Sequence, residues 1–155
     1  MSEAAASETP PILIVDDQPK LLRLVVELMT RLGFPDVEGV TDAVEALERM
    51  RKRRYALVIA DLDLEPMDGL QLLREIRTDD TLMNTPFILT ETSFEFEDIN
   101  VAHLAGADAF LLKPFDITLL KAKLKQVLNR RPRRREAALP TESTLSQDFP
   151  LLGKF

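Results

Sequence analysis

The stretch Tyr55-Ala56-Leu57-Val58-Ile59-Ala60-Asp61 decides the fold of this chain. Its residues 55–60 form an unbroken apolar run, which is the pattern of a strand with both faces buried. The run stops at Asp61, so a carboxylate stands at the carboxyl end of the predicted strand. A strand buried on both sides needs helices on both faces of its sheet, and the stretch therefore predicts an α/β domain.

Apolar runs alternate with segments of helical spacing on both sides of this stretch. Five strands joined by helices predict a five-stranded doubly wound parallel sheet, because each parallel connection is a right-handed crossover. The predicted strands are residues 11–15, 37–40, 55–60, 87–90 and 109–112. Three of the predicted helices cover residues 20–32, 97–105 and 117–128. Another begins at a cap on Thr41 or Asp42, and the fifth begins near Gly69.

Composition limits the class of protein. A chain of 155 residues with 45% hydrophobic content is long enough for one domain with an ordinary core. The absence of cysteine excludes disulfides and thiolate metal sites. The first residues lack the pattern of a secretion signal, and no apolar run is long enough to cross a bilayer. We therefore expect a cytoplasmic protein with no membrane insertion.

Charge is unevenly distributed along the chain. Residues 1–120 hold 11 basic and 23 acidic side chains, a net charge of −12, whereas residues 121–135 hold 8 basic side chains and no acid. Residues after Pro132 lack sustained periodicity and are rich in Pro, Ser and Thr, the composition of a tail. We predict a flexible N-terminus over 1–9, one domain over 10–130 and an Arg-rich C-terminal tail over 131–155.

Polar side chains follow four of the predicted strands. Asp16 and Asp17 come after the first, Asp61 after the third, Glu91 at the end of the fourth and Lys113 after the fifth. In an open α/β sheet ligands bind beyond the carboxyl ends of the strands, so these groups should converge. Clustered carboxylates favour a hard cation such as Mg²⁺, and a carboxylate can itself accept a phosphoryl group.

These residues carry a family resemblance. Val15-Asp16-Asp17, Asp61 with Met67-Asp68-Gly69, and Lys113-Pro114-Phe115 resemble the signature of response-regulator receiver domains over residues 10–130. The resemblance implies a flavodoxin-like, CheY-like fold. It also implies a single-domain response regulator of two-component or chemotaxis-type signalling, which is not an enzyme.

The resemblance implies a role for each site residue. A histidine kinase or phosphotransfer protein would phosphorylate the chain, which would then bind a downstream protein, with the flagellar motor as one candidate. Lys113 would contact the phosphoryl group, and its bond to Pro114 would be cis. Asp61 would be the phosphoacceptor, Asp16, Asp17, Asp61 and the backbone carbonyl of Asp63 would hold Mg²⁺, and Phe110 would be the aromatic switch.

One position departs from the family pattern. Receivers carry Ser or Thr at the end of the fourth strand, and here Glu91 takes that place, with Thr90 one residue earlier. A shift of one residue moves a side chain to the other face of a sheet, so Thr90 is not a simple substitute. Glu91 would repel a phosphoryl group and could pair with Lys113 instead.

An enzyme class offers an alternative. Asp61-Leu62-Asp63 after an apolar strand also resembles the nucleophile motif of haloacid-dehalogenase-type phosphatases. Those enzymes usually place the motif on the first strand and carry Thr or Val four residues after its first Asp. Here the strand is the third and Glu65 stands at that position, which argues against a phosphatase.

The tail supports a second alternative. Its arginines resemble the Arg-rich extension of the Cle proteins, a CheY-like subgroup that binds cyclic di-GMP. Guanidinium groups bind phosphate in bidentate geometry, although a solvated basic tail would look the same. The net charge of the body and the lack of a DNA-binding module argue against specific DNA binding. The residues concerned are Arg130, Arg131, Arg133, Arg134 and Arg135.

Overall fold

The computed structural model describes residues 9–93 and 95–129. In these residues five strands alternate with five helices, as the sequence predicted. The elements are β1 (Ile12–Val15), α2 (Pro19–Arg31), β2 (Val37–Val40), α3 (Ala43–Lys52), β3 (Leu57–Asp61), α4 (Gly69–Arg77), β4 (Phe87–Glu91), α5 (Phe96–Ala105), β5 (Ala109–Leu112) and α6 (Ile117–Leu128).

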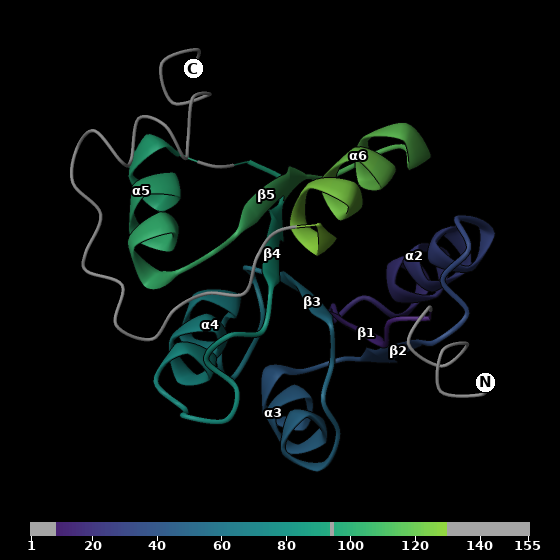
Figure 1. Ribbon diagram of the computed structural model, residues 1–155. Helices are drawn as coiled ribbons and strands as arrows, with labels where there is room; N and C mark the ends of the chain where they lie inside the picture. Colours follow the sequence, from purple (N-terminus) through teal and green to yellow (C-terminus); the bar gives the residue numbers. More distant parts are fainter. Residues whose placement is uncertain (1–8, 94, 130–155) are drawn as a thin grey trace.

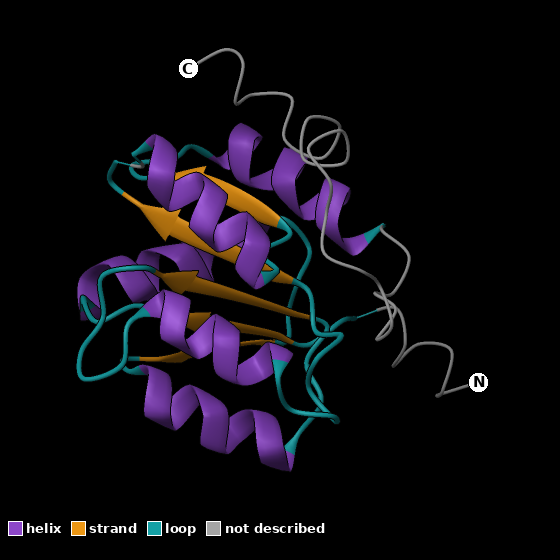
Figure 2. Ribbon diagram, turned by 90° about the vertical axis from the view of Figure 1, so that its left-hand side faces the viewer, coloured by secondary structure: helices purple, strands orange, loops and turns teal. Residues whose placement is uncertain are grey.

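The strands form one parallel sheet in the order β2-β1-β3-β4-β5. Helices α2 and α6 cover one face, and α3, α4 and α5 cover the other (Figures 1 and 2). A separate apolar cluster fills the space on each side, with Ile59 and Leu120 in one and Val58 and Leu72 in the other. The doubly wound, flavodoxin-like prediction is therefore confirmed.

The deciding stretch forms the central strand with a small shift. All five residues of β3 are buried, but the strand begins at Leu57 rather than Tyr55 and extends through Asp61. Tyr55 is buried outside the ladder, and its hydroxyl donates to Glu38 at 2.5 Å. The apolar run predicted burial correctly, whereas hydrogen bonding to β1 and β4 sets the limits of the strand.

The packing of α2 differs from the predicted apolar stripe. The helical spacing of Leu21, Leu24, Val25, Leu28 and Leu32 predicts that these residues share one apolar face. Leu24, however, is 50% exposed, whereas Leu22, Val25 and Met29 are buried. This helix has more apolar residues than one face can hold, so contact with the sheet selects which are covered. None of the helices in the described residues is long and apolar enough to cross a bilayer.

Candidate functional site

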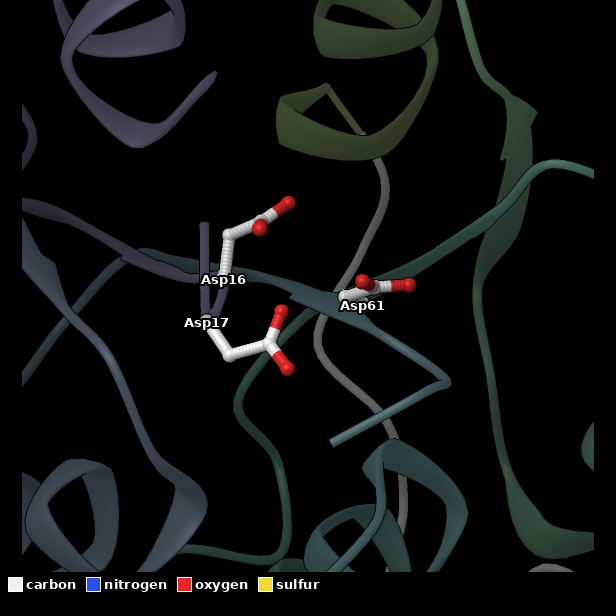
Figure 3. Close-up of side chains that lie close together, drawn as sticks. All are labelled: Asp16, Asp17 and Asp61. Carbon is white, nitrogen blue, oxygen red and sulfur yellow. The ribbon is translucent and has the colours of Figure 1, made fainter. Parts of the chain in front are cut away.

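The carboxyl ends of β1, β3 and β5 bring together the acidic residues and the lysine named above. Asp61 is the last residue of β3 and is only 4% exposed. Figure 3 shows Asp16, Asp17 and Asp61 clustered at this edge of the sheet. The Nζ atom of Lys113 donates to Oδ2 of Asp16 and to Oδ2 of Asp61, at 3.0 Å in each case. The predicted convergence is thus observed for these four residues.

The carboxylates are arranged to hold a cation. One oxygen each from Asp16, Asp17 and Asp61 lies within 4.8 Å of the others. Mg²⁺ takes oxygen ligands at about 2.0–2.1 Å, so two ligands on opposite sides of the ion lie about 4.2 Å apart. A small side-chain adjustment would bring these oxygens from at most 4.8 Å to about 4.2 Å apart, so the donor set fits Mg²⁺. An acidic cluster of this kind is where receiver domains bind Mg²⁺.

Asp63 contributes through its backbone in the structure. Its side chain is exposed and is not among the clustered carboxylates, while its N–H donates to Oδ1 of Asp61 at 3.3 Å. The predicted role of its carbonyl as a metal ligand stays a prediction.

Burial sets the electrostatics of the pocket. It raises the pKa of Asp61 above its ordinary value, although Lys113 acts in the opposite direction through its hydrogen bond and charge. Burial also lowers the pKa of Lys113, but Asp16 and Asp61 together outweigh it and leave that pKa raised. The lysine thus stays protonated, while the ionised form of Asp61 is penalised, and a bound cation would offset this penalty.

Gly69 allows the chain to pass close to the acceptor. A Cβ atom at this position would lie 2.3 Å from the carbonyl oxygen of Asp61 and 2.9 Å from the Cα of Leu62. Asp68 caps α4 and forms a capping box with Gln71. The sequence indicated the turn and the helix start but not this close approach, and the glycine itself is the one signal that could have suggested it.

Glu91 and Thr90 lie on opposite faces of the sheet. Thr90 is paired in register with Asp61, and paired residues of neighbouring parallel strands point to the same side. Glu91 follows Thr90 and therefore points to the other side. Its carboxylate accepts hydrogen bonds from the backbone N–H of Thr92 at 2.7 Å and from the Thr92 hydroxyl at 3.2 Å.

Two expectations about Glu91 have different outcomes. The idea that its side chain pairs with Lys113 is wrong for this structure, since the Nζ atom of Lys113 is held by Asp16 and Asp61. Asp16 and Asp61 are buried, whereas Glu91 is only partly buried and its carboxylate accepts from Thr92. The expectation that Thr90 does not simply replace the usual hydroxyl residue is consistent with the register of the strands, because the side chains of Thr90 and Glu91 point to different faces of the sheet.

The fifth strand carries the remaining receiver features. Phe110 is partly buried and packs against the cluster on the side of α3, α4 and α5, the same side to which Glu91 points. The Lys113–Pro114 peptide bond is cis, as the resemblance implied. The five predicted ligands Arg130, Arg131, Arg133, Arg134 and Arg135 lie outside the described residues, so their role stays a prediction.

Comparison with known sequences identifies relatives over the same region. The family model "Response regulator receiver domain" matches residues 12–125. Chemotaxis protein CheY-3 of Vibrio cholerae serotype O1 is 33% identical over 128 residues, which cover 83% of this chain and 98% of that protein. Chemotaxis protein CheY of Pseudomonas aeruginosa is 29% identical over 119 residues, covering 77% and 96% of the two chains.

Solved structures give the same result. The chemotaxis protein CheY4 of Vibrio cholerae aligns with a TM-score of 0.73 at 27% identity, over 77% of this chain and 98% of that chain. The receiver domain of a Pseudomonas aeruginosa sensor histidine kinase, whose structure has a magnesium ion in the active-site cleft, aligns with a TM-score of 0.71 at 26% identity, over 78% and 98%. CheY-like receiver domains are signalling modules and are generally not enzymes. The chain therefore belongs to the response regulator receiver domain family, in its CheY-like form.

Proposed function

We propose that Asp61 accepts a phosphoryl group from a phosphohistidine of a histidine kinase or phosphotransfer protein, and that the chain acts as a single-domain response regulator. The observation that carries this proposal is the position of the Lys113 ammonium, 3.0 Å from carboxylate oxygens of both Asp61 and Asp16. Asp17, which is exposed, completes the acidic cluster beside them.

The chemistry follows from these groups. A carboxylate oxygen of Asp61 attacks the phosphorus, the bond from phosphorus to the donor nitrogen breaks, and an acyl phosphate forms. The leaving nitrogen keeps the electron pair of the broken bond, and the donor leaves as neutral imidazole because its other ring nitrogen carries a proton during the transfer. Lys113 offsets negative charge on the transferred oxygens. Asp16, Asp17 and Asp61 would hold Mg²⁺, which supplies further charge neutralisation when bound.

The output surface is proposed from exposed apolar side chains near Phe110. Leu104 of α5 is 53% exposed, Leu112 of β5 is 47% exposed and Leu119 of α6 is 40% exposed. Exposed apolar residues gathered on adjoining elements suit a protein partner. A downstream protein, of which a flagellar motor component is one candidate, would bind here. Glu91 points to the same side of the sheet as Leu112 and would border this surface.

Labelling with a small phosphodonor tests the acceptor. The full chain is incubated with radiolabelled acetyl phosphate and Mg²⁺, and protein-bound phosphate that is stable in neutral buffer and labile to base is counted. Asp61→Asn should remove the label. Glu65→Gln is the matched control, because it changes an exposed carboxylate four residues away in the same loop and should leave labelling in place.

Removal of the metal provides the second arm. Chelation of Mg²⁺ should suppress labelling of the unaltered chain, since three clustered carboxylates would then face the incoming phosphate with only Lys113 to balance them. Label that persists in Asp61→Asn, with unchanged circular dichroism, would show that another residue is the acceptor and would refute the assignment.

The Arg-rich segment favours a second candidate function, binding of cyclic di-GMP. Its support is the run of five arginines in the six positions 130–135. Calorimetric titration of cyclic di-GMP into the full chain tests it, with a chain truncated after Asn129 as control. Saturable binding that disappears on truncation supports a second-messenger effector. Absence of binding would leave the phosphorylated receiver as the only proposed function.

A further inference from the structure

A pocket of about 770 Å³ opens at the end of the domain opposite Asp61. It lies where the chain enters β3 and β4, between the end of α3 and the loop from α4 to β4, and its lining includes Tyr55, Thr81 and Pro86. Since β3 rises about 3.3 Å per residue, the four steps from Leu57 to Asp61 separate the two ends by about 13 Å. The pocket is thus separate from the acidic site.

Consecutive cations line this pocket. Arg51, Lys52, Arg53 and Arg54 all contribute to its wall, and all four are exposed. Arg53 already has a structural role, because its guanidinium pairs with Asp36 and Glu38 and lies 5.4 Å from the centre of the Tyr55 ring.

Among the described residues the other three cations form no such pairs, although the charge of Arg51, after the hydrogen bonds from Thr81, contributes to lowering the pKa of the nearby Asp79. No ion pair of Arg51, Lys52 or Arg54 is found within the described part of the chain. Asp80 is the one acidic residue in the wall of this pocket, so these three cations leave an excess of two positive charges. The nearby Asp79 accepts from both the backbone N–H and the hydroxyl of Thr81, at 2.8 and 2.7 Å.

A solvated helix end explains only part of this arrangement. Basic side chains in the last turn of α3, including Arg51 and Lys52, complement the partial negative charge of the helix C-terminus. Arg49 is in the same turn and could serve that purpose, although it also pairs with Glu38 and Glu45. Arg54 lies beyond the helix, where the dipole gives no reason for a cation.

The size and lining of the pocket define the ligand class. Cavities of about 300–1,000 Å³ are typical of small-molecule sites. Guanidinium groups bind phosphate oxygens in bidentate geometry, and Asn84 adds an amide to the same wall. A single carboxylate would balance only one of the two excess positive charges, whereas a di- or triphosphate group carries enough negative charge to balance both.

We propose that this basic pocket, formed by Arg51, Lys52, Arg54 and Asn84, binds the oligophosphate group of a small phosphorylated molecule. The group could belong to a nucleotide or to an inorganic oligophosphate. Binding here is independent of Asp61 and would give the domain a second input at the opposite end of its sheet.

Isothermal titration calorimetry of the full chain tests the proposal with tripolyphosphate and GTP as separate probes. A chelator replaces Mg²⁺, so that neither probe can enter the acidic site through a metal. The triple variant R51S/K52S/R54S should bind at least about tenfold more weakly, because it removes three charge-assisted contacts. The matched control R23S/K121S/K125S removes the same charge from exposed positions on α2 and α6 and should change affinity less than twofold.

The outcomes separate the possibilities. Equal affinities for the two probes assign the pocket to the phosphate group alone, whereas tighter binding of GTP adds a contact with the nucleoside. The proposal is overturned if neither probe binds, if both triple variants lose affinity equally, or if truncation after Asn129 removes the binding. Asp61→Asn should bind both probes normally, so a failure of the phosphoacceptor assignment would not affect this test.

Discussion

Replacement of Gly69 by alanine would probe how closely the start of α4 approaches the acceptor. The new Cβ would lie 2.3 Å from the carbonyl oxygen of Asp61, and the two atoms must separate by about 1.1 Å to reach an ordinary contact of 3.4 Å. Both are attached to backbone, so no side-chain rotation can relieve the overlap. Insertion of a methyl group into a packed site costs about 1–3 kcal/mol, and we expect the upper part of that range.

The loss should appear in both stability and metal binding. For a domain of this size, each kcal/mol lowers Tm by about 4 °C, so Gly69→Ala should melt about 8–12 °C below the unaltered chain. Moving the backbone of Asp61 also shifts a metal ligand. Changes to groups that position metal ligands commonly weaken affinity by about 10- to 100-fold, and we expect Mg²⁺ affinity to fall within that range.

Thermal unfolding by circular dichroism and calorimetric titration of Mg²⁺ measure the two effects. Gly33→Ala is the matched control. Gly33 has a φ of 99°, and no atom lies within 4 Å of the place that an alanine methyl group would take, so the variant suffers backbone strain of about 1–2 kcal/mol without steric contact. It should lose about 4–8 °C in Tm and keep its Mg²⁺ affinity.

The comparison can refute the reasoning in two ways. If Gly69→Ala melts with the unaltered chain, the close approach to Asp61 does not constrain the backbone. If Gly33→Ala loses as much Mg²⁺ affinity as Gly69→Ala, the effect follows from general destabilisation and not from displacement of the acceptor.

Further predictions concern buried polar groups. Arg77→Met should lower the free energy of unfolding by about 3–5 kcal/mol in urea titration. The Arg77 side chain is 12% exposed, and its guanidinium binds Asp108 and the carbonyls of Met83, Thr85 and Gly106. A loss below about 1 kcal/mol would contradict this role. A hydrogen bond from Tyr55 lowers the pKa of Glu38, and Arg49 and Arg53 act in the same direction while burial opposes them. The ionised Glu38 therefore stabilises the fold at a pH above its ordinary pKa of 4.5, and this stabilisation is lost as the pH falls through its pKa in the folded protein. The stability difference between the unaltered chain and Glu38→Gln should therefore narrow in acid, and a constant difference would refute this. Burial and Glu38 raise the pKa of Tyr55, the only tyrosine, to about 12, and the absorbance of its phenolate should titrate there and shift downward in Glu38→Gln.

The sequence alone was sufficient for the architecture and for most of the acidic site. Apolar runs such as residues 55–60 mark buried strands, and the helical spacing between them requires crossovers, so the five-stranded parallel sheet follows from the pattern. Since the carboxyl ends of parallel strands share one edge, Asp16, Asp61 and Lys113 could be placed together without coordinates. These inferences depend on short-range periodicity and on chain direction, which the sequence contains in full.

Only the tertiary structure decided which partners and faces the side chains take. Lys113 pairs with Asp16 and Asp61 rather than with Glu91, and Leu24 of α2 faces outward. These choices look equivalent in the sequence, and they differ in free energy only through desolvation and packing in the folded domain. The need for glycine at position 69, and the position of residues 80–86 beside the consecutive cations of the basic pocket, likewise depend on contacts between separate segments. The periodicity of the sequence determines the helices and strands. The contacts between them depend on how these elements are placed in space, which the local sequence pattern does not specify.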